Sequence, residues 1–297
     1  MGTRTLHRSL VSLLAVSAAA VLVPAAASPA AAAPTDCRGP KSGTLAEIRP
    51  GQRLEPGARL ADLASAAELV MQPDGNLVLY ALGNPGGYKL PLWNSGTYGN
   101  PGAYATQQED GNFVIYKQGG SAQTGGGIWH TATYGTSPGT GVVRASLMGG
   151  AFVVEGRNAG PSWSTGSSER QAWICSDYAT AAEAWWSGNW AQSASVWLVL
   201  QRDNNLVMYR KSDGKAIWNS GTYGGAYRLN LQMAPKDRGD LTLVEENRTA
   251  VRWRTGTAGN DAAYALLQDD GNFVVYKKDG GPGKGGGLWN TGTYNKI

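Results

Sequence analysis

Residues 69–80 read LVMQPDGNLVLY, in which two apolar runs flank the polar turn QPDGN. Short runs of this kind, with alternate residues sharing a face, are typical of paired strands. Pro73 suits the first position of a type I turn, and Gly75 suits the left-handed position that ends a three-residue hairpin loop. The stretch therefore predicts a β-hairpin in which Gln72 lies opposite Asn76.

Three other stretches repeat this hairpin pattern. Their loops are Glu109-Asp110-Gly111, Arg202-Asp203-Asn204 and Asp269-Asp270-Gly271. Asn204 stands where the other loops have Gly, and Asn is the non-glycine residue that best tolerates a positive φ angle. The pattern therefore predicts the same loop geometry in all four stretches.

A tryptophan recurs in the local frame Trp-x-[Ser/Thr]. There are six such residues, and we number the repeats that contain them 1 to 6: Trp93, Trp129, Trp163, Trp218, Trp253 and Trp289. Their spacings are 36, 34, 55, 35 and 36 residues, so one long interval separates two blocks of three repeats. We therefore predict two homologous domains, at residues 34–168 and 169–297, with the extra length around residues 167–197.

The composition favours an all-β fold. Among 297 residues there are 42 Gly, 11 Trp and 13 Tyr, with only 3 Phe and 16% charged residues. Gly is costly inside helices and useful in tight loops, while Trp, Tyr, Thr and Val favour strands. The length allows one or two domains with buried cores, so folding does not depend on disulfides.

The first 33 residues have the pattern of a secretory signal peptide. Arg4 and Arg8 precede an apolar run at residues 10–23, and a stretch of small residues ends at Ala33. The apolar run is short for a membrane span, so we expect a secreted protein without membrane insertion. Without Arg4 and Arg8 the chain has 24 basic and 22 acidic residues and no basic run, which gives a nucleic-acid partner no electrostatic support.

Histidine and cysteine are too few for most catalytic and metal sites. After the leader the chain has one histidine, His130, and two cysteines, Cys37 and Cys175. Zinc clusters and Cys/His nucleophile pairs are thereby excluded, and a Ser-His-Asp triad would have to use His130. In the Gly-rich segment at residues 280–285, Lys284 is followed by Gly285 and not by the Ser or Thr of a phosphate-binding loop, so this segment and the matching one at residues 119–127 predict flexible loops. We predict no catalytic residue, no metal and no other cofactor.

Four repeats carry Gln, Asp, Asn, Val and Tyr at alternate positions. Alternation puts Asn, Val and Tyr on one face of the outgoing strand, while the hairpin brings Gln opposite Asn and leaves Asp at the turn. The patch combines a carboxylate, two amides, a phenol and a small apolar contact, which suits the hydroxyls and C–H surface of a sugar. The candidate carbohydrate-binding residues are Gln72, Asp74, Asn76, Val78 and Tyr80; Gln108, Asp110, Asn112, Val114 and Tyr116; Gln201, Asp203, Asn205, Val207 and Tyr209; and Gln268, Asp270, Asn272, Val274 and Tyr276.

Repeats 3 and 5 provide an internal control. The positions that align with the five residues are Leu147, Gly149, Ala151, Val153 and Glu155 in repeat 3, and Lys236, Arg238, Asp240, Thr242 and Val244 in repeat 5. Both repeats keep the tryptophan element, so folding does not require the polar set. Its joint presence in four repeats is therefore better explained by ligand binding.

The pattern Q-x-D-x-N-x-V-x-Y with its Trp-x-[Ser/Thr] element resembles the monocot, or bulb-type, mannose-binding lectins. The resemblance covers nearly all of the chain after the leader, in two tandem copies. It implies two β-prism (type II) domains, each with three four-stranded antiparallel sheets around a pseudo-threefold axis and with Trp residues at the centre. It also implies that Asp and Asn bind the axial O2 of mannose, Gln binds O3, Tyr binds O4 and Val packs on the ring carbons. Repeats 3 and 5 inherit no such roles.

The cysteines differ from the family, whose domains often contain an internal disulfide. Here each predicted domain has one cysteine near its start. A bridge between Cys37 and Cys175 is the one intrachain disulfide that the sequence permits, and secretion favours its oxidation. Free or intermolecular thiols are the alternative.

The leading functional hypothesis is a secreted, non-catalytic lectin for mannose or mannose-rich glycans, with a homodimer left open. The alternative is a lectin-like bacteriocin, an antibacterial toxin with the same tandem fold. Such toxins tend to have a C-terminal extension, whereas this sequence ends four residues after Thr293, which favours the lectin. A glycosidase is disfavoured, because it needs two carboxylates about 5 to 10 Å apart across a bond, and pairs such as Glu109 and Asp110 are adjacent in turns.

Overall fold

The computed structural model describes residues 46–84, 87–135, 144–156, 160–175, 184–233, 239–247 and 250–297. The predicted signal peptide, residues 1–33, and Cys37 lie outside this part of the chain, so secretion and the bridge to Cys175 stay predictions. The described elements are all strands, and this part of the chain contains no helix that could cross a membrane.

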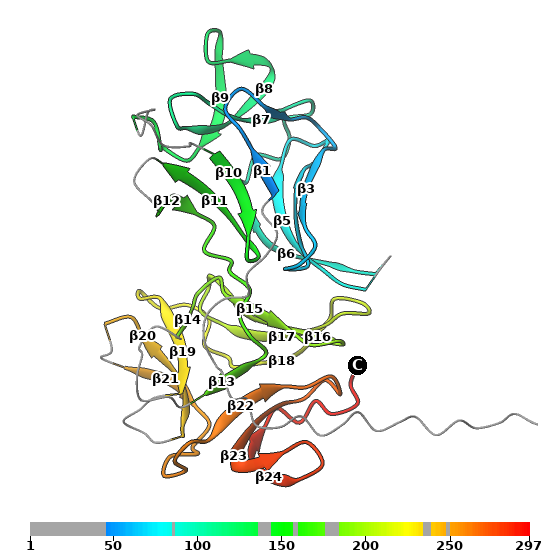
Figure 1. The fold of residues 1–297 in the computed structure, drawn as a ribbon, viewed down its shortest axis with the longest axis vertical. Helices are drawn as coiled ribbons and strands as arrows, with labels where there is room; N and C mark the ends of the chain where they lie inside the picture. The colour runs from blue at the N-terminus through cyan, green and yellow to red at the C-terminus, as the bar shows by residue number, and fades with distance from the viewer. Residues whose placement is uncertain are drawn as a thin grey trace, which may run out of the picture.

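The described strands form six four-stranded antiparallel sheets, one for each repeat (Figure 1). The sheet of repeat 1 contains, in order, β3 (Arg59–Asp62), β4 (Ala67–Met71), β5 (Leu77–Leu82) and β6 (Lys89–Asn94). The sheet of repeat 2 contains β2 (Arg53–Leu54), β7 (Tyr104–Gln107), β8 (Phe113–Ser121) and β9 (Gly125–His130). The sheet of repeat 3 contains β1 (Ala46–Ile48), β10 (Arg144–Met148), β11 (Ala151–Gly156) and β12 (Gly160–Ser164).

The second half of the chain repeats this arrangement. The sheet of repeat 4 contains β15 (Trp190–Gln192), β16 (Val196–Leu200), β17 (Leu206–Arg210) and β18 (Ala216–Asn219). The sheet of repeat 5 contains β14 (Trp185–Trp186), β19 (Leu229–Met233), β20 (Leu241–Glu245) and β21 (Val251–Arg254). The sheet of repeat 6 contains β13 (Trp173–Cys175), β22 (Tyr264–Leu267), β23 (Phe273–Gly281) and β24 (Gly285–Asn290).

Each domain begins with three short strands that are distributed among its three sheets. Strands β1, β2 and β3 join repeats 3, 2 and 1, and β13, β14 and β15 join repeats 6, 5 and 4. Each sheet thus receives one edge strand from the start of its domain and three strands from its own repeat. This is the predicted all-β fold, with two tandem β-prism domains of three sheets each. The predicted domain limits include residues outside the described ranges and stay predictions.

The hairpin loops have the geometry that the sequence predicts. In repeat 1 the backbone N of Gln72 donates to Asn76 O at 2.9 Å, and Gly75 N donates to Gln72 O at 3.0 Å. The last loop residue has a positive φ, 91° at Gly75 and 74° at Asn204. Asn204 therefore takes the left-handed position that glycine takes in the other loops.

The domain cores contain alternate residues of each strand and the six repeat tryptophans. In β5, Leu77 and Leu79 are fully buried. Trp93, Trp129 and Trp163 are half-buried and pack edge to face, with ring centroids 5.4 to 5.7 Å apart. Their counterparts in the second domain form a similar triangle, with ring centroids 5.4 to 5.9 Å apart. Edge-to-face packing is a favourable arrangement of aromatic rings, so each triangle links the three sheets of its domain.

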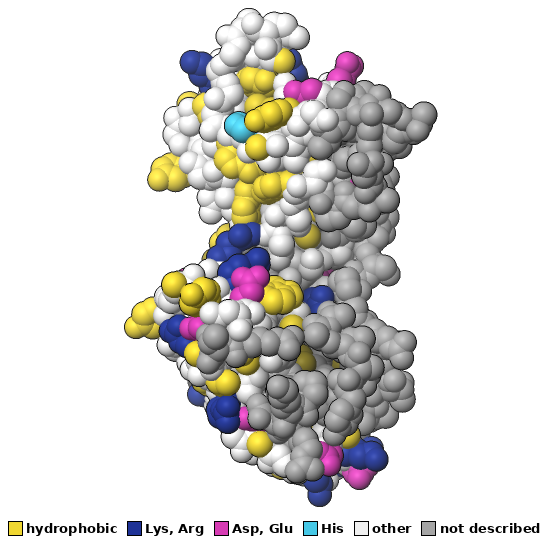
Figure 2. Space-filling view, turned by 90° about the vertical axis from the view of Figure 1, so that its left-hand side faces the viewer, with side chains coloured by type: hydrophobic (Ala, Val, Ile, Leu, Met, Phe, Trp, Pro, Cys, Tyr) yellow, Lys and Arg dark blue, Asp and Glu magenta, His cyan; other side chains and the backbone are white. Residues whose placement is uncertain are grey.

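The two domains pack against each other through the sheet of repeat 4. Trp190 and Trp197, on β15 and β16, are fully buried and belong to the hydrophobic cluster of the first domain. Trp190 Nε1 donates to Ser167 O at 2.6 Å, and the ring of Tyr88, before β6, lies 6.4 Å from that of Trp197. Basic and acidic side chains lie next to one another at the waist between the domains on the face in Figure 2. The sheet of repeat 4 therefore lies at the domain junction.

Candidate functional site

The polar set of repeat 1 lies on the outer face of its sheet. Leu77 and Leu79 of β5 point into the core, so the alternate residues Asn76, Val78 and Tyr80 lie on the opposite face. Val78 is nevertheless buried, with 3% of its surface exposed. The hairpin therefore brings the predicted residues together in a small patch with an apolar floor.

Gln and Tyr of the set form a hydrogen bond in all four complete repeats. In repeat 1, Gln72 Nε2 donates to the Tyr80 hydroxyl at 2.8 Å. The corresponding distances are 2.9 Å, 2.6 Å and 3.0 Å in repeats 2, 4 and 6. Because the phenol oxygen accepts this bond, its own proton is left to donate to a ligand, and the amide oxygen of Gln is left to accept.

Asp of the set holds the hairpin turn with one carboxylate oxygen. Asp74 Oδ1 accepts a hydrogen bond from the backbone N of Asn76 at 2.9 Å. The same distance separates the corresponding atoms in repeats 2, 4 and 6. Asp side chains commonly bond the backbone two residues on in this way. The second carboxylate oxygen is left for a ligand.

The tryptophan element fixes the orientation of the Asn side chain. In repeat 1, Asn76 Oδ1 accepts hydrogen bonds from Ser95 Oγ at 3.1 Å and from Thr97 N at 3.2 Å. The same bonds come from Thr131 and Thr133 in repeat 2, Ser220 and Thr222 in repeat 4, and Thr291 and Thr293 in repeat 6. Because Oδ1 is occupied, Asn offers a ligand the two donors of Nδ2. In the sequence this element is recognisable only as a marker of the fold, although its recurring pair of hydroxyl residues is a signal of this second role.

In three of the four polar sets the tyrosine keeps its phenolic proton. Burial raises the pKa of Tyr80, Tyr209 and Tyr276 above the usual 10.0, and the hydrogen bond from Gln partly offsets this effect. The negative charge of the Asp in the same set raises each pKa further. Each of these tyrosines therefore remains a hydrogen-bond donor at neutral pH.

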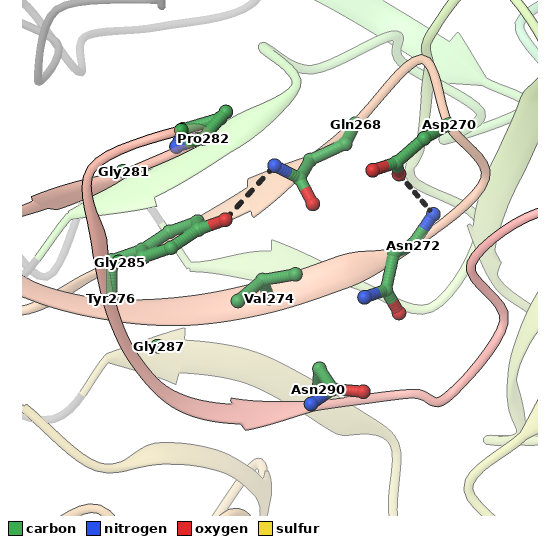
Figure 3. Close-up of a pocket in the computed structure, with 11 residues that line it drawn as sticks. Gln268, Asp270, Asn272, Val274, Tyr276, Gly281, Pro282, Gly285, Gly287 and Asn290 are labelled. Atoms are coloured by element: carbon green, nitrogen blue, oxygen red, sulfur yellow. Dashed lines mark hydrogen bonds between the residues drawn. The ribbon is translucent and has the colours of Figure 1, made fainter.

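In repeat 6 the five predicted residues line a pocket of about 360 Å³ (Figure 3). Gly281, the last residue of β23, and Pro282, in the turn to β24, lie beside Tyr276 at one end of this pocket. Asn290, at the end of β24, lies on the side of Val274 away from Gln268. A hairpin that the sequence analysis did not include in the site thus forms part of its wall.

The Gly-rich segments form regular hairpins, so the prediction of flexible loops is wrong. Strands β23 and β24 pair again at Gly281 and Gly285 beyond the sheet, and β8 and β9 do the same in repeat 2. The Tyr264 hydroxyl anchors the hairpin of repeat 6 by donating to Gly280 O at 3.0 Å. A Cβ atom at Gly280 would lie 2.8 Å from Gly285 O, so glycine is needed for the close approach of the two strands.

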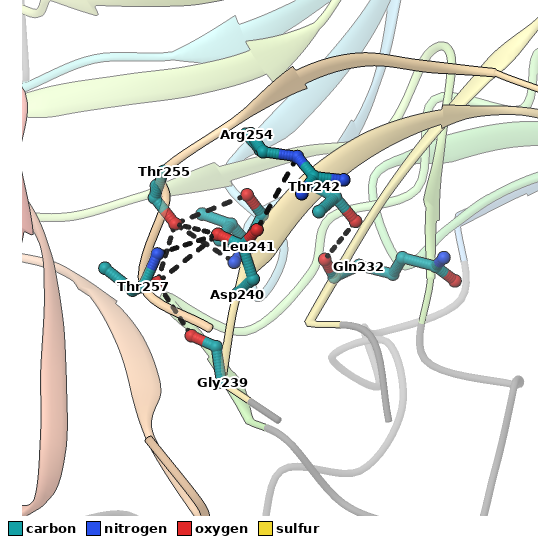
Figure 4. Close-up of polar contacts among 8 residues, drawn as sticks. All are labelled: Gln232, Gly239, Asp240, Leu241, Thr242, Arg254, Thr255 and Thr257. Carbon is teal, nitrogen blue, oxygen red and sulfur yellow. Dashed lines mark hydrogen bonds and ion pairs between the residues drawn. The ribbon is translucent and has the colours of Figure 1, made fainter. Parts of the chain in front are cut away.

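Repeats 3 and 5 keep the sheet but lack the full polar set. In repeat 5, Asp240 takes the Asn position, and its Oδ1 accepts hydrogen bonds from Thr255 Oγ1 at 2.8 Å and Thr257 N at 3.0 Å (Figure 4). Asp240 has no amide donor, and its second oxygen lies 3.8 Å from Arg254 Nε. In repeat 3 the same position is Ala151, which has no polar side chain. Of the aligned positions, Lys236 and Arg238 lie outside the described residues.

The polar set of repeat 4 is complete but lies at the domain junction. Arg202, in its hairpin loop, donates to Thr165 O of the first domain. Tyr209 pairs across the strands with the buried Trp197. Asp203 is exposed, so the site remains open to solvent on the loop side. Any ligand of this site therefore binds next to the first domain.

His130 has a structural role in its turn. Its Nδ1 accepts a hydrogen bond from Ala132 N at 3.0 Å, just as Asn94 Oδ1 accepts one from Gly96 N at 2.9 Å in repeat 1. Within the described ranges, no three His, Cys, Asp or Glu side chains are grouped so that they could hold a metal ion.

Comparison with known proteins finds lectins. No family model matches the chain. The chain is 31% identical over 97 residues to a mannose-specific lectin of Aloe arborescens, which covers 32% of this chain and 77% of that protein. It is 30% identical over 80 residues to mannose-specific lectin 2 of Crocus vernus, and the match spans 27% of this chain and only 29% of that protein. Similar solved structures include a monomeric monocot mannose-binding lectin from Gastrodia elata (26% identity, TM-score 0.33, 41% of this chain and 98% of that one) and a two-domain fetuin-binding lectin from Scilla campanulata (24% identity, TM-score 0.29, 84% of this chain and 98% of that one).

Proposed function

The chain belongs to the family of monocot mannose-binding lectins, and from this premise we propose that it is a secreted, non-catalytic lectin with four sites for mannose-containing glycans. The sites are the polar sets of repeats 1, 2, 4 and 6. One of the two curated relatives is matched over less than a third of its length, so the ligand has to be argued from the sites themselves. Secretion is supported by the leader pattern at residues 1–33.

One observation carries the proposal. In each complete repeat the internal hydrogen bonds use one oxygen of Asp, the oxygen of Asn and the amide nitrogen of Gln. They leave an acceptor on Asp, donors on Asn, an acceptor on Gln and a donor on Tyr, above a small apolar residue. Vicinal hydroxyls of a hexose both donate and accept, so two neighbouring hydroxyls match this alternation of donors and acceptors.

The proposed preference for mannose depends on the neighbouring Asp and Asn. A hydroxyl that lies between them donates to the free Asp oxygen and accepts from Asn Nδ2. In the pose that the family resemblance implies, this hydroxyl is the axial O2 of mannose. Glucose has an equatorial hydroxyl there, which would leave both groups unpaired, and unpaired polar groups lower affinity strongly.

Calorimetric titration of the mature chain tests this function. Methyl α-mannoside should bind with a stoichiometry near four per chain, in the presence of EDTA, and methyl α-glucoside should bind much more weakly. The variant Asn76→Ala should bind three. Equal affinity for the two glycosides, or loss of binding in EDTA, would contradict the proposal.

The non-catalytic part of the proposal rests on the charge inventory of the sets. Each polar set has a single carboxylate, and one of its oxygens is bonded to the backbone. Glycoside hydrolysis usually requires two carboxyl groups on either side of the scissile bond. Incubation with mannobiosides should therefore release no monosaccharide, which chromatography of the mixture would check.

A further inference from the structure

Besides the pocket of repeat 6, the structure has a second pocket, which lies in repeat 2 next to the Gln–Tyr pair. This pocket has a volume of about 390 Å³ and extends over β7, which is next to the site strand β8, and over β2, which pairs with β7. Its lining includes Arg53, Tyr104 and Thr106, and it shares Gln108 and Tyr116 with the proposed mannose site. The hydrogen-bonded pair of Gln108 and Tyr116 therefore belongs both to the proposed mannose site and to this pocket.

Arg53 gives this second pocket a positive charge. Its guanidinium lies 4.1 Å from the ring centroid of Tyr104, within the range of a cation–π contact. Tyr104 is buried, and its hydroxyl donates to Gly120 O at 2.8 Å, so the platform under the guanidinium is fixed. No Asp or Glu among the described residues forms an ion pair with Arg53. Its N–H donors are therefore left for a ligand, and their fork matches the two oxygens of an anionic group.

The two acidic residues that line the second pocket, Glu109 and Asp110, lie in the hairpin loop that follows β7. Asp110 is shared with the mannose site and holds the backbone N of Asn112 at 2.9 Å. Glu109 is exposed in the hairpin loop, at the far end of β7 from Tyr104. An anionic group that contacts Arg53 would therefore lie at the end of the pocket formed by β2 and the start of β7.

Repeat 6 provides a matched site without this charge. Leu54 pairs with Ala105 in repeat 2, as Ile174 pairs with Ala265 in repeat 6. In this register, Trp173 takes the position of Arg53. The residue that pairs with this position on the neighbouring strand is Thr106 in repeat 2 and Leu266 in repeat 6. The five residues of the proposed mannose site are the same in the two repeats, so their contacts with the mannose are matched while the charge on the flank differs.

We propose that the Arg53 pocket is a subsite for an anionic group, a carboxylate or a phosphate, on the glycan unit next to the mannose of repeat 2. This inference rests on the proposed function, because the neighbouring unit is positioned by the mannose. Arg53 binds the anionic oxygens, while Gln108 and Tyr116 contact both units. Repeat 6 takes neutral glycans through the same mannose contacts. The two domains thus recognise different extensions of one common sugar.

Two single-site variants of the whole chain test the inference. One carries Asn76→Ala, Asn205→Ala and Asn272→Ala and keeps the repeat-2 site; the other carries Asn76→Ala, Asn112→Ala and Asn205→Ala and keeps the repeat-6 site. Each is titrated with methyl α-mannoside, a neutral mannobioside, a mannosyl-uronic acid disaccharide and a mannobioside that carries a phosphate on its second unit. We expect an anionic ligand to bind about tenfold more tightly than methyl α-mannoside at repeat 2 and with no gain at repeat 6. Whether the gain comes with the uronic acid or the phosphate identifies the source of the charge.

The gain should disappear in Arg53→Gln and diminish in high salt, since a charge contact is screened. Binding of methyl α-mannoside to both variants without an Arg53-dependent gain would overturn this inference alone. No binding of methyl α-mannoside to either folded variant would overturn the proposed function as well. If a triple variant fails to fold, the whole chain and its Arg53→Gln variant are compared instead, and equal affinity of the two for every anionic ligand would overturn the inference.

Discussion

Asn76 and Asp240 occupy equivalent positions in repeats 1 and 5, and both accept hydrogen bonds from the tryptophan element that follows. Ser95 and Thr97 bond to Asn76, and Thr255 and Thr257 bond to Asp240. The acceptor oxygen is thus a structural requirement that either residue meets. The amide donor is present only in Asn, so it is the part of the side chain that is available to bind the ligand.

The variants Asn76→Asp and Asn76→Ala separate these two roles. Both should remove one of four mannoside sites, because both remove the Nδ2 donor. Asn76→Ala should also lower the free energy of unfolding by about 1 to 2 kcal/mol, because it leaves the buried Thr97 N and the Ser95 hydroxyl without their acceptor. Asn76→Asp should be less destabilising. Urea unfolding and mannoside titration of the two variants check this, and undiminished binding by Asn76→Asp would show that the donor is not needed.

The raised tyrosine pKa values predict how binding depends on alkaline pH. Tyr80, Tyr209 and Tyr276 have pKa values above 10.0, so each gives up its proton at a higher pH in the folded chain than in the unfolded chain. The contribution of these phenols to binding and stability should be fully present below pH 10 and decline only as the pH rises above it. Titrations with methyl α-mannoside at increasing pH measure this. A decline that starts near pH 8 would show that another group controls binding.

For single residues, the sequence predicts well which side chains face the ligand. It predicts poorly which residues fix the orientation of those side chains. The alternation of Gln, Asp, Asn, Val and Tyr is sufficient to predict which side chains share a face. It does not reveal that the Ser95 and Thr97 groups bond to Asn76, because that contact joins the hairpin to a residue about twenty positions later. Arg53 is still more remote, because it reaches the repeat-2 site through a two-residue strand.

At the scale of elements, the tryptophan triangles determine how firmly three sheets are joined. Trp93 lies 5.5 Å from Trp129 and 5.7 Å from Trp163, measured between ring centroids. Trp93→Ala should therefore lower the free energy of unfolding by about 3 kcal/mol and weaken both sites of the first domain. Tyr98→Ala is a matched control, because Tyr98 is an aromatic residue that is 71% exposed, and its loss should change stability by less than about 0.5 kcal/mol. Thermal melts that fall equally for the two variants would contradict this role of the triangle.

The sequence predicts the hairpins but not the strands that complete the sheets. Each of the four complete repeats has two apolar runs around a recognisable turn, and the pairing of β4 with β5, β7 with β8, β16 with β17 and β22 with β23 confirms these hairpins. Strands β1, β2 and β3 have three, two and four residues, too few for any alternation to stand out. The sheet that each of these strands joins is determined by tertiary packing, because the three sheets close around one core. The Gly-rich hairpins were missed for a similar reason, because their regular pairing depends on contacts with Tyr104 and Tyr264.

At the scale of the whole molecule, the junction joins the two domains into one packed unit. Trp190 and Trp197 are fully buried in the cluster of the first domain, although they belong to the first sheet of the second. An isolated half would expose these rings or lose them, and exposed apolar patches promote association. Tests of how the domains cooperate are therefore best made on the whole chain with individual sites removed.

A single shallow site for one hexose should bind weakly, with a dissociation constant on the order of millimolar. Useful affinity would then come from several sites that engage one displayed surface, which can raise avidity by about 10² to 10⁴ without any new contact. The complete sets of the first domain are in repeats 1 and 2, and those of the second are in repeats 4 and 6, so sites lie on four different sheets. Sites that face different directions favour cross-linking of separate glycans over clamping of one.

Agglutination of mannan-coated beads tests this arrangement. The whole chain should agglutinate the beads at about a tenfold lower concentration of sites than either of two full-length variants. One variant carries Asn205→Ala and Asn272→Ala, the other carries Asn76→Ala and Asn112→Ala, and each keeps two sites within one domain. Light scattering measures agglutination, and sedimentation confirms that all three proteins have the same oligomeric state. Equal agglutination at equal concentrations of sites would show that the two sites within one domain already supply the avidity. The second domain would then add sites without adding a new direction of contact.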